Sequence, residues 1–257
     1  MRVIVTGGEG FIGKHLRRRL SGIADTVSID VRTGGDAARI GGLLAGGGIG
    51  AVFHLAAETS VFNEDLGAIE RENVRAFMTV ATECRRHGAK LVYASSSTAM
   101  AGNTTSMYGI SKAFGEQFAA AYCPGATGVR LHNVYGPGQR EGTLLYNLLH
   151  GPCTIYNQGR NVRRFTFVGD AVEGLLYAAT CSRRLVNVRN PEALTVREFV
   201  EAVAAHRTVD VTYTDDARPL DNFEQRVDER VFCVPLRYRS VAEGLAATFA
   251  TDTGPDV

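Results

Sequence analysis

A serine cluster followed by a tyrosine–lysine pair is the part of the sequence best suited to chemistry. Ser95, Ser96 and Ser97 end an apolar run, and Tyr108 and Lys112 follow four positions apart. On a helix, residues at i and i+4 share one face. An ammonium beside a phenol favours the phenolate, so a group with an ordinary pKa of about 10 becomes usable as a base near neutral pH. With Ser97 bonding the same oxygen, the pattern predicts proton removal from an alcohol while another group takes a hydride.

A tyrosine and a lysine at this spacing also fit an ordinary helix surface, so the remaining chain must decide. Near the start, a strand predicted over Arg2–Val5 runs into glycines at positions 7, 8, 10 and 13, and a helix begins near Phe11. Gly8, Gly10 and Gly13 give the spacing G-x-G-x-x-G. Glycines allow a tight turn and a close approach to a pyrophosphate, and the helix start offers unpaired N–H groups and a positive dipole end. The pattern indicates a dinucleotide site.

An acid stands at the end of the next strand, which we expect over Thr26–Val31. Asp30 there can accept hydrogen bonds from the adenosine ribose hydroxyls and repel a 2′-phosphate. This favours NAD over NADP, although the nearby Arg32 keeps NADP as a minor alternative.

Strands and helices alternate through the first half of the chain. Further strands are predicted at Ala51–Leu55, Leu91–Ser95 and Val129–Leu131, with helices at Glu72–His87 and Ser106–Tyr122. Such alternation is typical of a doubly wound parallel α/β sheet of the Rossmann type, in which ligands bind beyond the carboxyl ends of the strands. The chemically useful residues all fall at such ends: Gly7–Gly13, Asp30, Ala56–Ala57, Ser95–Ser97 and Asn133.

The second half is less regular. Pairs of capping residues, Asp170 with Glu173, Thr195 with Glu198 and Ser240 with Glu243, predict three helix starts. The glycine-rich run 41–50 lacks the sequence of a phosphate loop and is expected to be a flexible loop. We expect a Rossmann domain over 1–134, rejoined by 166–190, and a smaller C-terminal substrate lobe made mainly of 135–257.

Composition narrows the class of protein. The 257 residues carry a net charge of +1, and no basic stripe suggests nucleic-acid binding. Five scattered cysteines show no metal-ligand spacing, which fits free thiols in a reducing compartment, and we expect no bound metal. Neither a signal region nor a membrane-spanning run is evident, so a cytoplasmic protein without a membrane partner is expected.

Together these segments resemble the extended short-chain dehydrogenase/reductases, specifically the NAD-dependent epimerase/dehydratase family that acts on nucleotide sugars. TGGEGFIG, Asp30, HLAA, Asn73–Val74, YASSS, YGISK, RLHNVYGP, RRFTFVGDAV and SVAEGL occur in the family's order over nearly the whole chain.

The resemblance implies tightly held NAD, a nucleotide-diphosphate sugar substrate, and a homodimer formed through Glu72–His87 and Ser106–Tyr122. It makes Tyr108 the base, Lys112 its partner and Ser97 the hydroxyl donor. The cofactor residues that it implies are Gly7, Gly10, Phe11, Ile12, Gly13, Asp30, Leu55, Ala56, Ala57, Ser95, Tyr108 and Lys112. The substrate residues are Ser97, Asn133, Arg163 and Arg218.

The chain departs from the family in places that bear on the reaction. Only 108 − 97 = 11 positions separate Ser97 from Tyr108, so a substrate-side loop is shortened, and Arg164 replaces the acid of the usual Arg-Asp-Phe. Thr98 and Ala99 stand where the family's dehydratases resemble each other in carrying an acidic pair.

A keto-sugar reductase would use NADPH, which Asp30 disfavours. We therefore predict 4-epimerisation of a UDP-hexose of the glucose/galactose type through a transient 4-keto sugar. A dehydratase or keto-sugar reductase of the same family is the alternative, and a non-catalytic NAD-binding sensor is the alternative from another class.

Overall fold

The computed structural model describes residues 1–218 and 220–250. Pro219 and the end of the predicted lobe, 251–257, lie outside the described residues.

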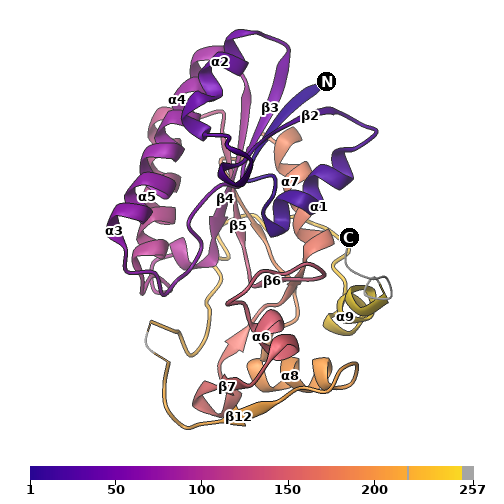
Figure 1. Ribbon diagram of the computed structural model, residues 1–257. Coiled ribbons are helices and arrows are strands. Elements are labelled where there is room, and N and C mark those ends of the chain that lie inside the picture. The colour runs from indigo at the N-terminus through magenta and orange to yellow at the C-terminus, as the bar shows by residue number, and fades with distance from the viewer. Residues whose placement is uncertain (219, 251–257) are drawn as a thin grey trace.

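A parallel sheet forms the centre of the molecule (Figure 1). In the described part of the chain it has six strands in the order β10-β5-β4-β3-β1-β2, and every pair is parallel. The strands are β1 (Arg2–Thr6), β2 (Asp25–Ile29), β3 (Ile49–His54), β4 (Lys90–Ser96), β5 (Thr127–Leu131) and β10 (Leu185–Val188). The order reverses between β1 and β3, which is the switch point where doubly wound sheets bind ligands. The predicted fold class is confirmed.

Helices cover both faces of the sheet. On one face lie α2 (Ile40–Ala45), α4 (Ala76–His87) and α5 (Met107–Tyr122), and on the other α1 (Phe11–Leu20) and α7 (Val168–Thr180) (Figure 1). Strand residues alternate between the two cores: Val3 and Val5 pack toward α1 and α7, whereas Ile4 packs toward α2 and α4. This double burial explains the continuously apolar strands.

Helix α3 (Leu66–Ile69) lies beside α5, and a separate group of elements forms a lobe at the carboxyl ends of the strands (Figure 1). The lobe elements are β6 (Val134–Tyr135), α6 (Leu144–His150), β7 (Cys153–Ile155), β8 (Val162–Arg163), β9 (Thr166–Phe167), β11 (Leu194–Thr195), α8 (Val196–Ala204), β12 (Val211–Tyr213) and α9 (Val241–Ala250). The lobe core contains Phe165 stacked on Phe199 at 3.9 Å between ring centroids.

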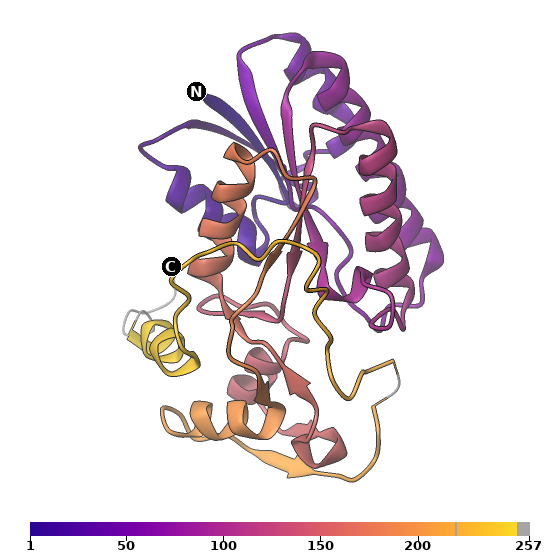
Figure 2. The same ribbon diagram turned by 180° about the vertical axis from the view of Figure 1, so that it is seen from behind.

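After β12 the chain leaves the lobe and returns to the sheet before α9, as Figure 2 shows from behind. The Asn187 N–H in β10 donates to the Phe232 carbonyl at 2.8 Å, which fixes this return. Residues from distant parts of the sequence therefore meet where the lobe joins the carboxyl ends of the strands.

Two local predictions are wrong. Helix α7 begins at Val168 with Phe167 as its N-cap, so Asp170 lies in the first turn, where its carboxylate bonds Arg239 instead of capping the helix. In the glycine-rich run, Ile40–Ala45 is helical because Ile40 and Leu44 bury one helix face against the core beside α4. The capping boxes at Thr195 and Ser240 are confirmed.

Candidate active site at the carboxyl ends of the strands

The glycine turn after β1 is shaped by close backbone contacts. Gly7 has φ of +71°, and a Cβ there would lie 2.6 Å from the Ala56 nitrogen. A Cβ on Gly13 would collide with the Gly7 carbonyl and lie 2.8 Å from the Gly8 Cα. Side chains are therefore excluded for backbone reasons at Gly7 and Gly13. The turn brings the ends of β1 and β3 together, as the sequence predicts.

The start of α1 suits an anion. Gly10 is the N-cap, without a side-chain cap, and the first turn contains no acidic residue. The N–H groups at this helix start are thus not covered by a capping side chain, and the helix dipole adds a partial positive charge. A Cβ on Gly10 would meet only the Gly7 carbonyl, at 3.1 Å, so the outer side of the turn is open. The turn fits the pyrophosphate of a dinucleotide.

Asp30 lies directly after β2, beside this turn, and is only 6 % exposed. Its Oδ2 accepts from the Glu9 N–H at 2.9 Å and its Oδ1 from the Arg32 N–H at 3.0 Å. A carboxylate has about four acceptor sites, so capacity remains for ribose hydroxyls. The Arg32 guanidinium is held by the Glu9 carbonyl at 2.7 Å. The position fits the predicted contact with the adenosine ribose.

Tyr108, in the first turn of α5, is half-buried, and this partial burial raises the pKa of its hydroxyl. A hydrogen bond with the Ser96 side chain and the positive charge of Arg140 oppose this rise in pKa, while the charge of Glu58 adds to it. The Ser96 hydroxyl also accepts from the Thr98 hydroxyl at 2.8 Å. Ser96 is thus the cluster member that bonds Tyr108, which sequence spacing alone did not separate from Ser97.

Lys112 lies one turn after Tyr108, and its Nζ is 5.6 Å from the centroid of the Tyr108 ring. The Nζ donates to the Ala94 carbonyl at 3.2 Å, and burial lowers the pKa of Lys112 to about 8. Burial is the largest influence on the Tyr108 pKa, and a lowering of that pKa by Lys112 stays a prediction. Burial and the charge of Lys112 also lower the pKa of His54 to about 3, so His54 is neutral.

The other two serines face different partners. The Ser95 hydroxyl donates to Glu116 at 2.5 Å, so any contact of Ser95 with a cofactor must come from its backbone. Glu116 in turn receives two hydrogen bonds from Arg130, at 2.8 and 2.7 Å. Ser97 is 3 % exposed, and its carbonyl accepts from Asn103 at 3.0 Å. The predicted bond from Ser97 to substrate stays a prediction.

The sequence reasoning missed Glu58 and Arg140, two charged residues that loops bring to Tyr108. Asn73 accepts from the Glu58 N–H at 2.7 Å and donates to Ser111 on α5 at 3.0 Å, which fixes the loop after β3. The Arg140 guanidinium reaches the same loop through the Thr59 carbonyl at 3.3 Å. The family motif Asn73–Val74 was the sequence feature that could have predicted this anchoring of the loop after β3.

The predicted substrate residues lie beside a segment that we call the strap, Asp221–Arg226. Asn133, with φ of +33°, donates to Gln225 at 2.5 Å. Arg163 is 7 % exposed, forms an ion pair with Asp221, and donates to the Asn222 carbonyl at 2.6 Å.

Arg218, just before the strap, lies over the rings of Phe62, at 3.7 Å to the centroid, and Tyr156, at 5.7 Å. The structure therefore brings Asn133 and Arg163 to one segment and leaves Arg218 against aromatic side chains.

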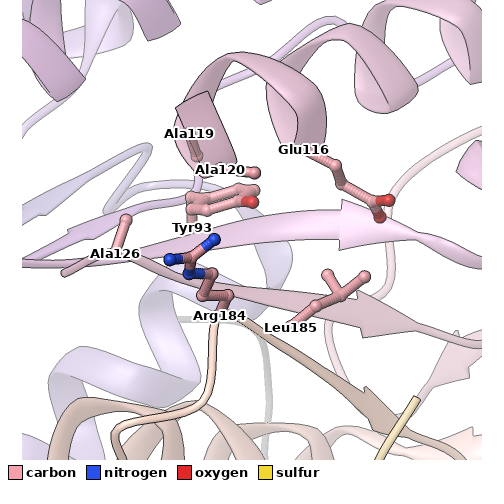
Figure 3. Close-up of a pocket in the computed structure, with 7 residues that line it drawn as sticks. All are labelled: Tyr93, Glu116, Ala119, Ala120, Ala126, Arg184 and Leu185. Atoms are coloured by element: carbon pink, nitrogen blue, oxygen red, sulfur yellow. The ribbon is translucent and has the colours of Figure 1, made fainter. Parts of the chain in front are cut away.

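A cavity of about 80 Å³ lies between α5 and the sheet. Figure 3 shows Tyr93 between the α5 alanines, Ala119 and Ala120, and Arg184. Ligand pockets usually measure about 300–1,000 Å³, so this cavity is too small for a dinucleotide. Within residues 1–218 and 220–250, no helix is long and apolar enough to cross a membrane and no acidic, histidine or cysteine cluster has the makings of a metal site.

Comparison with known proteins places these features in a family. A UDP-glucose epimerase-like protein of Bacillus subtilis, YtcB, is 27% identical over 228 residues, covering 68% of this chain and 71% of that protein. UDP-glucuronic acid decarboxylase 1 of Arabidopsis thaliana is 27% identical, and the match covers 85% of this chain but 61% of that protein.

Solved structures agree over almost the whole chain. MoeE5 in complex with UDP-glucose and NAD is 28% identical, with a TM-score of 0.84 and coverage of 97% of this chain and 98% of that chain. The Thermus thermophilus UDP-glucose 4-epimerase in complex with NAD is 26% identical, with a TM-score of 0.80 and the same coverage. Residues 3–190 match the NAD dependent epimerase/dehydratase family. The chain belongs to this family, as its resemblance predicts, and NAD is the family's cofactor.

Proposed function

We propose that this protein epimerises the C4 position of a UDP-hexose of the glucose/galactose type. The proposal is supported by the residues gathered around Tyr108 and by the similarity to proteins whose structures hold NAD with UDP-glucose or UDP-glucuronic acid. When bound beside the glycine turn and Asp30, NAD would supply a reversible hydride acceptor and, while oxidised, a positive charge.

The residues of this chain would transfer the proton and hold the sugar. Tyr108 takes the proton of the 4-hydroxyl and gives it back to the 4-keto oxygen after the sugar has turned. Ser96 holds the Tyr108 hydroxyl, and Ser97 is proposed to bond the reacting oxygen. Lys112 supplies positive charge beside the ring and is proposed to contact the nicotinamide ribose.

The observation that carries epimerisation is the absence of a carboxylate directly after the serine cluster. The Thr98 hydroxyl donates a hydrogen bond to the Ser96 hydroxyl, and Ala99 is buried at 6 % exposure. Elimination of water would need an acid–base pair near the sugar. Glu58 is a carboxylate near Tyr108, but it lies on the loop after β3 and not directly after the serine cluster, and its Oε1 accepts from the Ser60 N–H of the same loop at 2.8 Å. This favours an epimerase over a dehydratase.

The sugar must turn while the nucleotide stays in place. We propose that Arg218 and Asn133 contact the diphosphate, since guanidinium–phosphate pairs are charge-assisted and often bidentate. Arg163 was predicted for the same role. In this structure its guanidinium bonds Asp221 and the strap backbone, so direct phosphate contact by Arg163 requires those bonds to open.

The test is incubation of the purified protein and NAD with UDP-glucose, UDP-galactose, UDP-glucuronic acid or UDP-N-acetylglucosamine, followed by chromatography and mass spectrometry. Formation of the 4-epimer at unchanged mass is expected for UDP-glucose and UDP-galactose. Products that have lost water or carbon dioxide would identify a dehydratase or decarboxylase instead. If wild type and Tyr108→Phe both bind NAD and neither converts any of these sugars, the result would favour the alternative of a non-catalytic NAD-binding sensor.

A further inference from the structure

Asn103, in the shortened loop between β4 and α5, joins the serine cluster to the strap. Its side chain is fully buried, at 0 % exposure. The amide Nδ2 donates both to the Ser97 carbonyl at 3.0 Å and to the Arg226 carbonyl at 2.7 Å. The amide Oδ1 accepts from the Arg226 N–H at 3.0 Å. One side chain therefore bonds both backbone groups of a strap residue and the end of the catalytic strand.

The backbone of the same loop adds further bonds to this connection. The Asn222 side chain donates to the Asn103 carbonyl at 2.9 Å, and the Thr105 hydroxyl donates to the Leu220 carbonyl at 2.7 Å. The short loop therefore bonds the strap and the preceding Leu220 directly, although more than one hundred positions separate them from it in sequence.

The strap in turn holds the proposed diphosphate residues. Gln225 bonds Asn133, and Asp221 pairs with Arg163. Arg218 lies only three positions before the strap. Displacement of the strap would move the partners of Asn133 and Arg163 and the chain next to Arg218, whereas the glycine turn and Asp30 belong to the ends of β1 and β2.

The amide of Asn103 supplies both the donors and the acceptor that this set of bonds needs. Aspartate lacks the two donors, serine lacks the reach to pair with both backbone groups, and alanine would remove these partners from Arg226. The matching of donor and acceptor to the C=O and N–H of one residue is the reason that the contact fixes a single position of the strap.

We propose that Asn103 is a positioning residue that docks the strap and thereby sets the affinity for the nucleotide diphosphate of the substrate. This rests on the proposed function, because it takes Asn133, Arg163 and Arg218 as the residues that contact the diphosphate. Asn103 has no exposed surface and acts through Arg226 and, along the strap, through Gln225 and Asp221.

The experiment compares Asn103→Ala with Asn190→Ala and uses UDP as the probe in calorimetry, together with NAD binding and steady-state kinetics. Asn190 is a matched control: it is 2 % exposed and its Nδ2 donates to the Arg239 carbonyl at 2.7 Å, away from the strap. Asn103→Ala is expected to weaken UDP binding and raise KM for the sugar nucleotide by about tenfold, with kcat within about threefold of wild type and NAD affinity unchanged. Asn190→Ala should lower stability without moving KM.

Asn222→Ala is the second variant in case Asn103→Ala does not fold, because it deletes only the bond to the Asn103 carbonyl from a half-buried strap position. A smaller rise in KM in the same direction is expected. If wild type binds UDP and KM is unchanged in the folded strap variants, the positioning role is overturned while the proposed function stands. If wild type fails to bind any UDP-sugar, both are overturned.

Discussion

The Lys112 Nζ lies 5.6 Å from the centroid of the Tyr108 ring while it donates to the Ala94 carbonyl at 3.2 Å. The helical spacing of four positions thus places the ammonium over the Tyr108 ring. The hydroxyl itself is bonded by Ser96. Burial, the Ser96 hydroxyl and the surrounding charges therefore all affect the pKa of the Tyr108 hydroxyl.

Replacing Tyr108 by Phe removes the proposed base and leaves the ring packing. Turnover is expected to fall by about 10²–10⁴-fold, the usual contribution of a positioned acid–base group. NAD binding should be retained, because the glycine turn and Asp30 are untouched. Tyr122→Phe, on the same helix and 39 % exposed, is the control and should turn over normally. Equal rates for wild type and Tyr108→Phe would remove the tyrosine from the mechanism.

Lys112 makes a prediction for stability against pH. Its pKa is about 8 in the folded protein and about 10.5 when unfolded, so the unfolded chain binds more protons between these pH values. The free energy of unfolding, without cofactor, should therefore rise from pH 8 to 10.5 through this group. Buried tyrosines and cysteines act in the opposite direction, so the quantity to measure by urea denaturation is wild type minus Lys112→Met. A difference that stays flat or falls over this range would contradict the lowered pKa.

Ser96 and Ser97 are separated by their effects on the pH profile. Ser96→Ala deletes the hydrogen bond that lowers the Tyr108 pKa, so the pH at half-maximal kcat/KM should move upward. Ser97→Ala should lower kcat with less movement of the profile, since its predicted partner is the sugar oxygen. Rates across pH 6–10 for both variants test this. The reverse result would make Ser97, and not Ser96, the partner of the phenol.

Sequence spacing was sufficient for the parts of the site that are local. The glycine turn, Asp30 and the Tyr108–Lys112 pair each lie within one strand end and one helix start, where period and turn chemistry decide the geometry. Arg163 and Asp221 are 58 positions apart and meet only through the return of the chain from the lobe. No local pattern encodes that return. Asp170 was mistaken for a cap because its actual partner, Arg239, is equally remote in sequence.

Gly13→Ala tests the glycine turn. The new Cβ would meet the Gly7 carbonyl and the Gly8 Cα, both of which are backbone and cannot move away independently. Loss of about 1–3 kcal/mol of stability is expected from such overpacking, together with loss of NAD binding. Gly42→Ala is the control, because a Cβ there meets nothing within 4 Å inside α2. Helix propensity predicts a gain of up to about 1 kcal/mol for it. Thermal unfolding with and without NAD distinguishes the two.

The outer face of α4 and α5 carries apolar side chains that a monomer would leave in water. Met78 is 38 % exposed, Ile110 50 % and Phe114 37 %, and the two helices lie side by side (Figure 1). Contiguous exposed apolar area of this kind marks interaction surfaces. We expect a homodimer through this face, and Phe114→Glu should shift it to monomer in size-exclusion chromatography with light scattering, because a carboxylate would be buried without a partner. Leu43→Glu, at 38 % exposure on α2, should leave the mass unchanged. A monomeric wild type at micromolar concentration, or a dimer that survives Phe114→Glu, would contradict this interface.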